Sequence, residues 1–250
     1  MDPNELRVRE ETLRRLRANP ESYLAEYTSK FGNILNADNA ATLFDEYNQD
    51  PAKYREAVHP AATWIRDELF QRALGERAPD GRNRVVFTAG GNAAGKSTAL
   101  AVTGIAGRSQ VVFDSTFSNP EHARRLMEQA LGAGKTVTVL HVSRPLEEMF
   151  AAMLDRAELQ GRVVTIEQLL DSHRGSAQAV CDLLREYAHD LSVRFLFVDN
   201  SARGTREGTI ELALPQDYTE IRKRLYELLH AEYQTGRITE AIYGRIRGRD

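Results

Sequence analysis

Residues 90–97 read Gly-Gly-Asn-Ala-Ala-Gly-Lys-Ser and fit the pattern G-x-x-x-x-G-K-[ST] of a phosphate-binding loop. Small residues suit such a loop, because bulky side chains would keep the backbone N–H groups away from phosphate oxygens. The apolar run 85–88 precedes the loop and the helix-forming run 97–102 follows it, which is the strand and helix context that the motif needs. A chance glycine-rich turn is the alternative, and that context argues against it.

The loop predicts a site for ATP and Mg²⁺. We expect Lys96 to reach the β- and γ-phosphates and the Ser97 hydroxyl to bind Mg²⁺, while the N-terminus of the following helix adds partial positive charge. The residues expected to bind the nucleotide are Gly90, Gly91, Asn92, Ala93, Ala94, Gly95, Lys96, Ser97 and Thr98.

Arginines that could neutralise a moving phosphoryl group follow in residues 154–165. Arg156 and Arg162 lie between the last two main predicted strands, where kinases of this fold carry a lid, and His173 and Arg174 follow shortly after. Planar guanidinium groups bind phosphoryl oxygens in a fixed geometry and stay charged. The alternative for each arginine is a place on a solvated helix flank.

The remaining motifs narrow the class of phosphate-loop protein. A GTPase needs an Asn-Lys-x-Asp motif, which the chain lacks, and motor ATPases need a strand that ends in Asp-Glu, whereas the candidate strands end in Asp114-Ser and Asp199-Asn. A small-molecule or nucleotide kinase remains, in which a carboxylate takes the proton of an acceptor hydroxyl.

The elements that must position these residues alternate between strand and helix, which predicts an α/β fold: a P-loop kinase-like parallel sheet of about five strands with helices on both faces, plus N- and C-terminal helical additions. The predicted strands are 31–36, 84–88, 110–113, 136–142 and 193–198, with a further short strand at 209–214 after a polar loop at 201–208. The predicted helices are two in the first thirty residues, then about 40–47, 51–74, 97–102, 120–131, 146–160, two between 166 and 188, and a helical region from 218 to 249; residues 75–83, with Pro79, form a surface connection.

Bulk composition excludes several classes. The net charge of −3 gives no global basic field for nucleic acid, and the arginine clusters at residues 7–17 and 237–249 are interleaved with acidic residues, as on solvated helix faces. The single Cys181 excludes an internal disulfide framework and a cysteine-based zinc site. No apolar stretch is long enough to span a bilayer and no secretory signal is visible, so we expect a cytoplasmic protein.

At this point the motifs resemble a known family. Asp114-Ser-Thr116, the segment 136–145 that ends Val-Ser-Arg-Pro, Arg156-Ala-Glu, Gly161-Arg162 and His173 are similar to the zeta toxin family of ATP-dependent kinases. The resemblance covers about residues 33–200. It implies phosphorylation of the 3′-hydroxyl of the amino sugar in UDP-N-acetylglucosamine, which poisons cell-wall synthesis, and restraint by a small antitoxin protein.

The chain differs from the family in the order of its segments along the sequence. In the family the catalytic aspartate follows the strand after the phosphate-loop helix, but the interval 97–110 is too short for that segment. A matching segment stands upstream, from Ile34 to Asn39, with Val58-His59-Pro60 beyond it. We therefore predict a circular permutation, which is physically allowed because either chain end can supply a parallel strand.

The resemblance makes Asp38 the general base, at the carboxyl end of a parallel strand where ligands bind in open sheets. The alternative, which is compatible with it, is that Asn36 or Asp38 caps the helix near Ala40. Asp114 and Thr116 resemble the family's Glu-Gly-Thr phrase, which contacts the sugar, although Asp is shorter than Glu and Ser115 replaces Gly.

The remaining expectations concern other positions. His59 is expected to be structural, and Asp199 and Asn200 either lie near the adenine or form a turn. The predicted division is a helical arm at 1–30, a P-loop kinase domain at 31–215 and a C-terminal helical extension at 216–250. Within the kinase domain we expect the permuted base segment at 31–75, the phosphate loop at 84–102 and the lid at about 156–175.

Three questions stay open from the residues alone. The acceptor could be an antibiotic or polynucleotide hydroxyl instead, or the chain could be a nucleotide-binding interaction module. The N-terminal arm could guard the nucleotide cleft, form a dimer contact or simply pack. The oligomeric state is not determined by the sequence.

Overall fold

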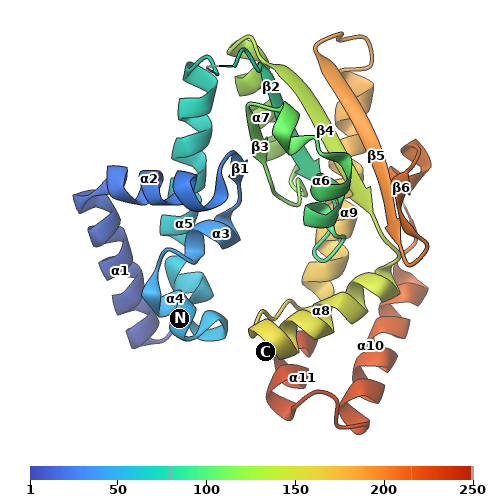
Figure 1. Cartoon of the computed structure of the whole chain (residues 1–250). Coiled ribbons are helices and arrows are strands. Elements are labelled where there is room, and N and C mark those ends of the chain that lie inside the picture. The colour runs from blue at the N-terminus through green and yellow to red at the C-terminus, as the bar shows by residue number, and fades with distance from the viewer. Residues whose placement is uncertain (79, 215, 249–250) are drawn as a thin grey trace.

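The computed structural model describes residues 1–78, 80–214 and 216–248 and is built around one six-stranded sheet (Figure 1). The sheet order is β1-β3-β2-β4-β5-β6. The first five strands in this order run parallel to one another, and β6 pairs antiparallel to β5. The predicted sheet of five parallel strands is therefore confirmed. The strands are β1 (Ile34–Leu35), β2 (Arg84–Ala89), β3 (Val111–Phe113), β4 (Thr136–Ser143), β5 (Val193–Ser201) and β6 (Gly204–Glu207).

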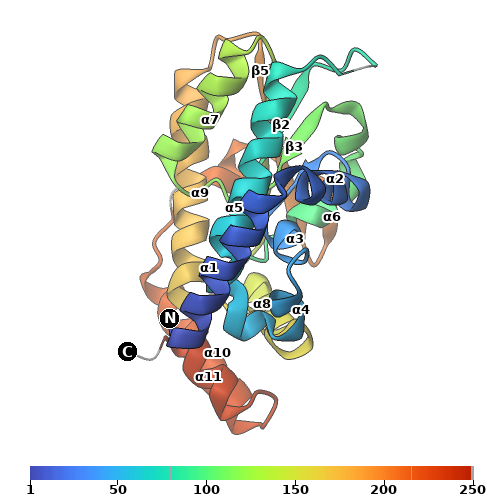
Figure 2. The ribbon, with the colours of Figure 1, turned by 90° about the vertical axis from the view of Figure 1, so that its left-hand side faces the viewer.

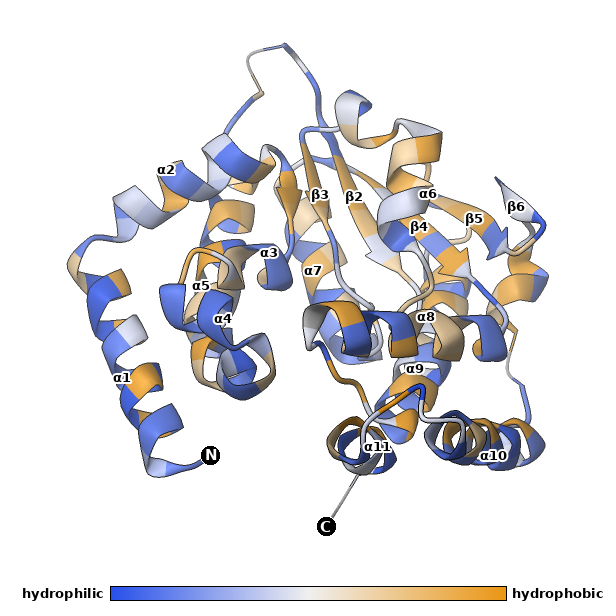
Figure 3. Cartoon of the chain, turned by 60° about the horizontal axis from the view of Figure 1, so that its bottom comes forward, coloured by the Kyte–Doolittle hydropathy of each residue, from blue (hydrophilic) through white to orange (hydrophobic). Residues whose placement is uncertain are grey.

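The central strands are apolar on both sides, because helices cover both faces of the sheet. Along β2, Val85 and Phe87 enter one hydrophobic core while Val86 enters the other. Successive side chains of a strand point to opposite faces, which accounts for this alternation. Figure 3 shows the hydrophobic strands β2, β3 and β4 between helices whose outer surfaces are hydrophilic.

The helices divide between the two faces of the sheet (Figures 1 and 2). The first core includes buried residues of α1, α2, α5, α7 and the C-terminal half of α9, and the second includes residues of α6, α8, α10, α11 and the N-terminal half of α9. The bounds are α1 (Pro3–Ala18), α2 (Pro20–Phe31), α3 (Ala37–Ala41), α4 (Asp45–Gln49), α5 (Pro51–Gly75), α6 (Lys96–Thr103), α7 (Pro120–Gly132), α8 (Leu146–Gln160), α9 (Ile166–Glu186), α10 (Thr219–Gln234) and α11 (Glu240–Arg247).

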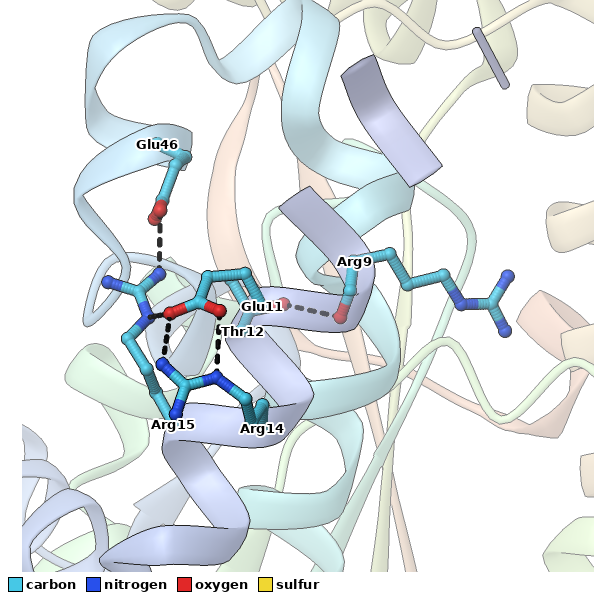
Figure 4. Close-up of polar contacts among 6 residues, drawn as sticks. All are labelled: Arg9, Glu11, Thr12, Arg14, Arg15 and Glu46. Atoms are coloured by element: carbon cyan, nitrogen blue, oxygen red, sulfur yellow. Dashed lines mark hydrogen bonds and ion pairs between the residues drawn. The ribbon is translucent and has the colours of Figure 1, made fainter. Parts of the chain in front are cut away.

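The N-terminal helix α1 packs along α5, and two of its arginines pair with acidic side chains. Arg14 binds Glu11 on the same helix, and Arg15 binds Glu46 of α4 at 2.6 Å (Figure 4). Val8 and Leu16 of α1 are buried in the core. Hydrophobic burial holds α1 against α5, the part-buried pair of Arg15 and Glu46 links α1 to α4, and the exposed pair of Arg14 and Glu11 adds little stability.

Two helix predictions were wrong in detail. The predicted helix 40–47 is two short helices, α3 and α4, because Phe44 between them has extended backbone and turns its ring into the core against Tyr23. The two helices predicted between 166 and 188 are the single helix α9. Gly175 does not break that helix, and it lets the backbone of Ser118 approach so closely that a Cβ atom would lie 2.2 Å from the Ser118 carbonyl oxygen.

The segment 201–214 also differs from the prediction. The predicted polar loop contains β6, and the predicted strand 209–214 is a short 3-10 helix, Ile210–Ala213. An edge strand can be polar because only one of its sides is paired, and the Asp199 and Arg206 pair across β5 and β6 reinforces it. The predicted strand 31–36 is shorter, since Phe31 ends α2.

Two further expectations bear on the chain as a whole. Among the described helices, none is both long and apolar enough to cross a membrane. Pro79 of the predicted surface connection and residues 249–250 of the predicted C-terminal helical region lie outside the described residues.

Candidate active site

The candidate site is a cavity of about 620 Å³ at the carboxyl ends of the parallel strands. The residues that line it come from segments far apart in the sequence, which include the turn after β1, helix α5, the loop after β2 with the start of α6, the turn after β3, and the end of α8 with the residues that follow. Sequence-predicted residues that line it are Asp38, Asn92, Ala93, Gly95, Lys96, Ser97, Asp114, Thr116, Arg156 and Arg162.

The loop after β2 has the backbone conformation of a phosphate cradle. Gly90 and Gly95 have positive φ angles of 136° and 86°, which residues with a Cβ atom rarely adopt. A Cβ atom on Gly90 would also lie 2.3 Å from the carbonyl oxygen of Val142. Helix α6 begins at Lys96, directly after Gly95. The motif therefore has the strand, turn and helix that phosphate binding requires.

The hydrogen bonds of this loop leave donors for an anion. Within the described ranges, the backbone N–H groups of Gly95, Lys96, Ser97 and Thr98 have no acceptor. These amides are the free donors of a helix N-terminus, and the Ser97 side chain beside them is exposed. This arrangement fits a nucleoside triphosphate with its Mg²⁺, which Ser97 would help to hold.

Lys96 is drawn into the loop. Its Nζ donates to the carbonyl oxygens of Gly90 and Gly91, both at 3.1 Å. Burial lowers the pKa of Lys96 and the nearby Asp114 opposes that effect, while Arg156 lowers the pKa further. Both of these partners are neutral, so an incoming phosphate would give the ammonium group a negatively charged partner.

Asn200 and Ser172 support the loop, a role that the sequence analysis did not predict for either residue. Asn200 of β5 donates from Nδ2 to the Ala94 carbonyl oxygen at 2.9 Å, and Thr205 donates to its Oδ1. Ser172 of α9 accepts from the Asn92 amide at 3.0 Å. The prediction for Asn200 was a role near adenine or in a turn, and its contact with the loop was missed because a sequence does not show which strand ends adjoin.

Asp38 lies on the first turn of α3, where three contacts fix the backbone. Asn36 accepts from the Asp38 amide at 2.7 Å, so Asn36 is the cap of this helix, one of the two capping residues considered. The buried hydroxyl of Tyr27 donates to the Ile34 carbonyl oxygen at 2.8 Å and accepts from the Asn36 amide at 2.7 Å. Burial raises the pKa of Tyr27 to about 12, so this phenol remains a donor.

The Asp38 carboxylate faces arginines. Arg162 donates to its Oδ2 atom, and Arg55 of α5 lies 3.8 Å from its Oδ1 atom. Arg156 has no ion pair within the part of the chain that the structure describes. Burial first, and then the adjacent charge of Arg162, lower the pKa of Arg156. The two predicted lid arginines therefore share one cavity with Asp38 and Lys96.

Asp114 is buried at the end of β3, beside the phosphate loop. Its carboxylate accepts from Thr88 Oγ1 and Asn36 Nδ2, both at 2.6 Å. The following Ser115-Thr116 turn ends at Phe117, which has a positive φ of 55° and stacks on Phe87. A left-handed conformation at a bulky residue is strained, and such strain persists only where packing enforces it. This turn is held rigidly at the cavity wall.

Of the other residues singled out in the sequence, His173, Arg174 and Asp199 do not line the cavity, whereas His59 does. His173 is buried on α9, where its Nδ1 lies 2.7 Å from the Tyr218 hydroxyl, and burial lowers its pKa to about 4. It packs behind Gly91, outside the cavity lining. Arg174 stacks on Tyr218. Asp199 pairs with Arg206, while His59 is exposed and lines the cavity.

Two cavity residues on α5 were missed by the sequence analysis, Arg55 and Arg66. With His59 they are spaced four and eleven residues apart, and such positions fall within about 40° of one another around a helix. That spacing is a signal that the sequence contained. The spacing could not be interpreted from the sequence alone, because the sequence does not show that α5 lines the same cavity as the phosphate loop.

Comparisons with known proteins bear on part of the chain. Residues 100–203 match the family model described as Zeta toxin, which supports the predicted resemblance and, at the coarser level, a P-loop kinase-like nucleotide-binding function. The match begins after the phosphate loop, so neither Ser97 nor Asp38 falls within it, and it is shorter than the predicted 33–200. No curated protein matches the chain.

Proposed function

We propose that the protein, of which residues 100–203 match the Zeta toxin family model, is an ATP-dependent kinase that transfers the γ-phosphate to a hydroxyl of a nucleotide sugar, with UDP-N-acetylglucosamine as the first candidate. One observation carries the proposal. A loop with unpaired amides, Lys96 and the Asp38 carboxylate line the same cavity.

The nucleotide would be bound by residues 90–98. The amides of Gly95, Lys96 and Ser97 donate to phosphate oxygens, and Lys96 exchanges its two carbonyl partners for the β- and γ-phosphates. Ser97 helps to hold Mg²⁺, which supplies positive charge next to the transferred group. Asn200 and Ser172 keep the loop in shape.

Asp38 would act as the general base. A carboxylate within hydrogen-bond reach of the acceptor hydroxyl takes its proton as the bond to phosphorus forms. Arg162 and Arg156 neutralise the charge that spreads over the phosphoryl oxygens. Since Arg162 now binds Asp38, the phosphate must draw it away, which exposes the carboxylate to the acceptor.

Asp114 and Thr116 would orient the acceptor. The rigid turn after β3 presents both at the cavity wall, and Asp114 is itself oriented by Thr88 and Asn36. Asp114 already accepts two hydrogen bonds, and the lone pairs that remain free on its carboxylate would accept a hydrogen bond from the substrate.

The chain order supports a circular permutation. Strand β1 pairs with β3 at the outer side of the parallel sheet, and it precedes the phosphate loop in sequence. The turn after β1 nevertheless lines the same cavity as the loop. We propose that the base segment 31–75 belongs to the kinase domain 31–215, with residues 1–30 and 216–250 as helical additions, and that an antitoxin is a possible protein partner.

The test is a transfer assay with a panel of hydroxyl acceptors. Wild-type protein with Mg·ATP and UDP-N-acetylglucosamine should give a product heavier by one phosphate in mass spectrometry. Lys96→Met should abolish the product, because it removes the cation that contacts the phosphates, and Lys223→Met, which changes an exposed lysine of α10 that does not line the cavity, is the matched control. An unmodified panel after prolonged incubation would contradict the proposal.

A further inference from the structure

Arg237 ties the C-terminal helices to the end of α8, the helix that carries Arg156. It lies in the connection between α10 and α11, and each of its side-chain nitrogens contacts a different carboxylate. Its Nη2 donates to Asp155 at 2.6 Å, its Nε lies 3.1 Å from Glu158, and its Nη1 donates to Glu232 at 3.1 Å. Asp155 and Glu158 belong to α8 and Glu232 belongs to α10, so one guanidinium joins the two helices.

The backbone around Arg237 is fixed, so its side chain is already placed for these contacts. Gly236 turns the chain with a left-handed φ of 74°, and the Arg237 amide donates to the Glu232 carbonyl oxygen at 3.1 Å. The next residue, Ile238, is buried in the same core as Leu154 of α8. Three carboxylates that share one fixed guanidinium form a network, which stabilises more than an isolated surface pair does.

Hydrophobic packing weakens toward this end of α8. Leu154 and Ala157 are buried, but Leu159 is 83% exposed. Residues 161–165, which connect α8 to α9, form neither helix nor strand. The ion pairs of Arg237 therefore act where burial no longer fixes the helix.

The end of α8 that Arg237 holds also places both predicted lid arginines. Successive residues of a helix are rotated by about 100°, so Asp155 can face Arg237 while the next residue, Arg156, lines the cavity. The Arg156 carbonyl oxygen accepts from the Gly161 and Arg162 amides, which begins the turn that leads to Arg162. A shift of this end of α8 would therefore move both arginines.

Arg156 has no anchor of its own at the cavity wall. Its half-buried side chain forms no ion pair within the ranges that the structure describes. Burial, and then the positive charge of Arg162, lower its pKa, so the surroundings on balance disfavour its charge. The position of Arg156 thus depends on the helix turn that carries it, and Arg237 pairs with the carboxylates of that turn, Asp155 and Glu158.

We propose that Arg237 is a positioning residue, which fixes the end of α8 so that Arg156 stays in the cavity for phosphate transfer. This rests on the proposed kinase function and gives the C-terminal helices a part in it, because Arg237 itself does not line the cavity. A small displacement of a group that stabilises the transition state lowers the rate strongly. Binding of ATP in its ground state depends on the phosphate loop and is unaffected.

The first experiment measures the end of α8 without catalysis. Hydrogen exchange of backbone amides is followed by mass spectrometry in peptides that span residues 150–162. Arg237→Gln should speed exchange there by roughly 3- to 10-fold and leave β2 unchanged, because only the end of α8 loses its ion pairs. Arg224→Gln is the matched control, since Arg224 is an exposed arginine of α10 whose ion pair, with Glu227, lies within that helix. Equal exchange in wild type and Arg237→Gln would overturn the proposal.

The second experiment measures turnover with the acceptor that gains phosphate. Arg237→Gln should lower kcat by roughly 5- to 50-fold while KM for ATP stays the same, because Arg156 is displaced and the phosphate loop is not. Arg237→Lys should recover part of the loss, since an ammonium group keeps the charge but cannot reach three carboxylates at once. General unfolding would instead lower amide protection throughout the chain.

The same substitution in an Arg156→Gln background shows whether Arg237 acts through Arg156. Single-turnover assays with excess protein measure the slow transfer that remains. Arg237→Gln should then cost far less rate than it does in wild type, because residues that act together are not additive. An equal fold loss in the two backgrounds would overturn the positioning role.

The two proposals fail separately. If Arg237→Gln speeds exchange at the end of α8 but no acceptor gains phosphate, the kinase function is wrong and Arg237 still fixes that helix end. If phosphate is transferred and Arg237→Gln changes neither exchange nor kcat, the kinase function stands and the positioning role is wrong.

Discussion

At the scale of single residues, Asn36 connects the two carboxylates of the site. Its Oδ1 accepts from the Asp38 amide and its Nδ2 donates to Asp114 at 2.6 Å. One amide side chain therefore sets the start of α3 and the orientation of Asp114. An aspartate at this position would place a third carboxylate against Asp114, whereas the amide can accept on one side and donate on the other.

Asn36→Ala should lose about 1 kcal/mol of stability through the missing cap and, in addition, slow phosphate transfer. Thr239→Ala removes the cap of α11, where Thr239 accepts from the Ile242 amide, and serves as the control. Urea unfolding and transfer rates measured together separate the two effects. If both variants lose stability equally and neither loses activity, Asn36 acts only as a cap.

At the scale of elements, helix α2 holds strand β1 in place. The buried Tyr27 hydroxyl binds the Ile34 carbonyl oxygen and the Asn36 amide, while the Tyr27 ring packs on Phe31. Strand β1 has only two residues and pairs with β3 alone, so its own ladder is a weak anchor. The N-terminal arm thus contributes to the position of Asp38.

Tyr27→Phe should cost about 1 kcal/mol or more in the free energy of unfolding, because it leaves the half-buried Asn36 amide without its acceptor. The turn that carries Asp38 should loosen, so transfer should slow while affinity for ATP is retained. Tyr187→Phe, at the C-terminal end of α9, is a control away from the site. Chemical denaturation and nucleotide titration are the measurements, and normal transfer in a destabilised Tyr27→Phe would exclude the coupling.

The sequence predicted much of this arrangement. Continuous apolar runs identified the buried strands, and the glycine pattern identified the phosphate loop, because both signals are local. The break at Phe44 could not be predicted, since it depends on packing against the distant Tyr23, and the close approach of Ser118 to Gly175 is equally hidden in a sequence. The position of Arg66 in the cavity lining and the contact of Asn200 with the phosphate loop were missed for the same reason.

At the scale of the whole molecule, the packing that covers both faces of the sheet also buries two histidines in neutral form. His141 lies on β4 at 4% exposure and His173 on α9 at 7%. Burial lowers the pKa of each to about 4. Both folded-state values lie below the usual pKa of about 6.5, so the unfolded chain binds more protons as the pH falls through this window.

The protein should therefore lose stability progressively between about pH 6.5 and pH 4, with about 2 kcal/mol lost per histidine from pH 7.5 to pH 5. Urea unfolding across this range measures the slope. His173→Gln should reduce the slope, and His189→Gln, which changes an exposed histidine, should leave it unaltered. A flat profile above pH 5 would show that neither histidine is held neutral.

The central claim is that a carboxylate encoded before the phosphate loop performs chemistry beside it. Single-turnover phosphate transfer by Asp38→Asn, with nucleotide affinity measured on the same preparation, tests this most directly. The account predicts unchanged affinity for ATP and transfer slowed by about 10²- to 10⁴-fold, the usual contribution of a general base. Transfer at the wild-type rate would contradict it.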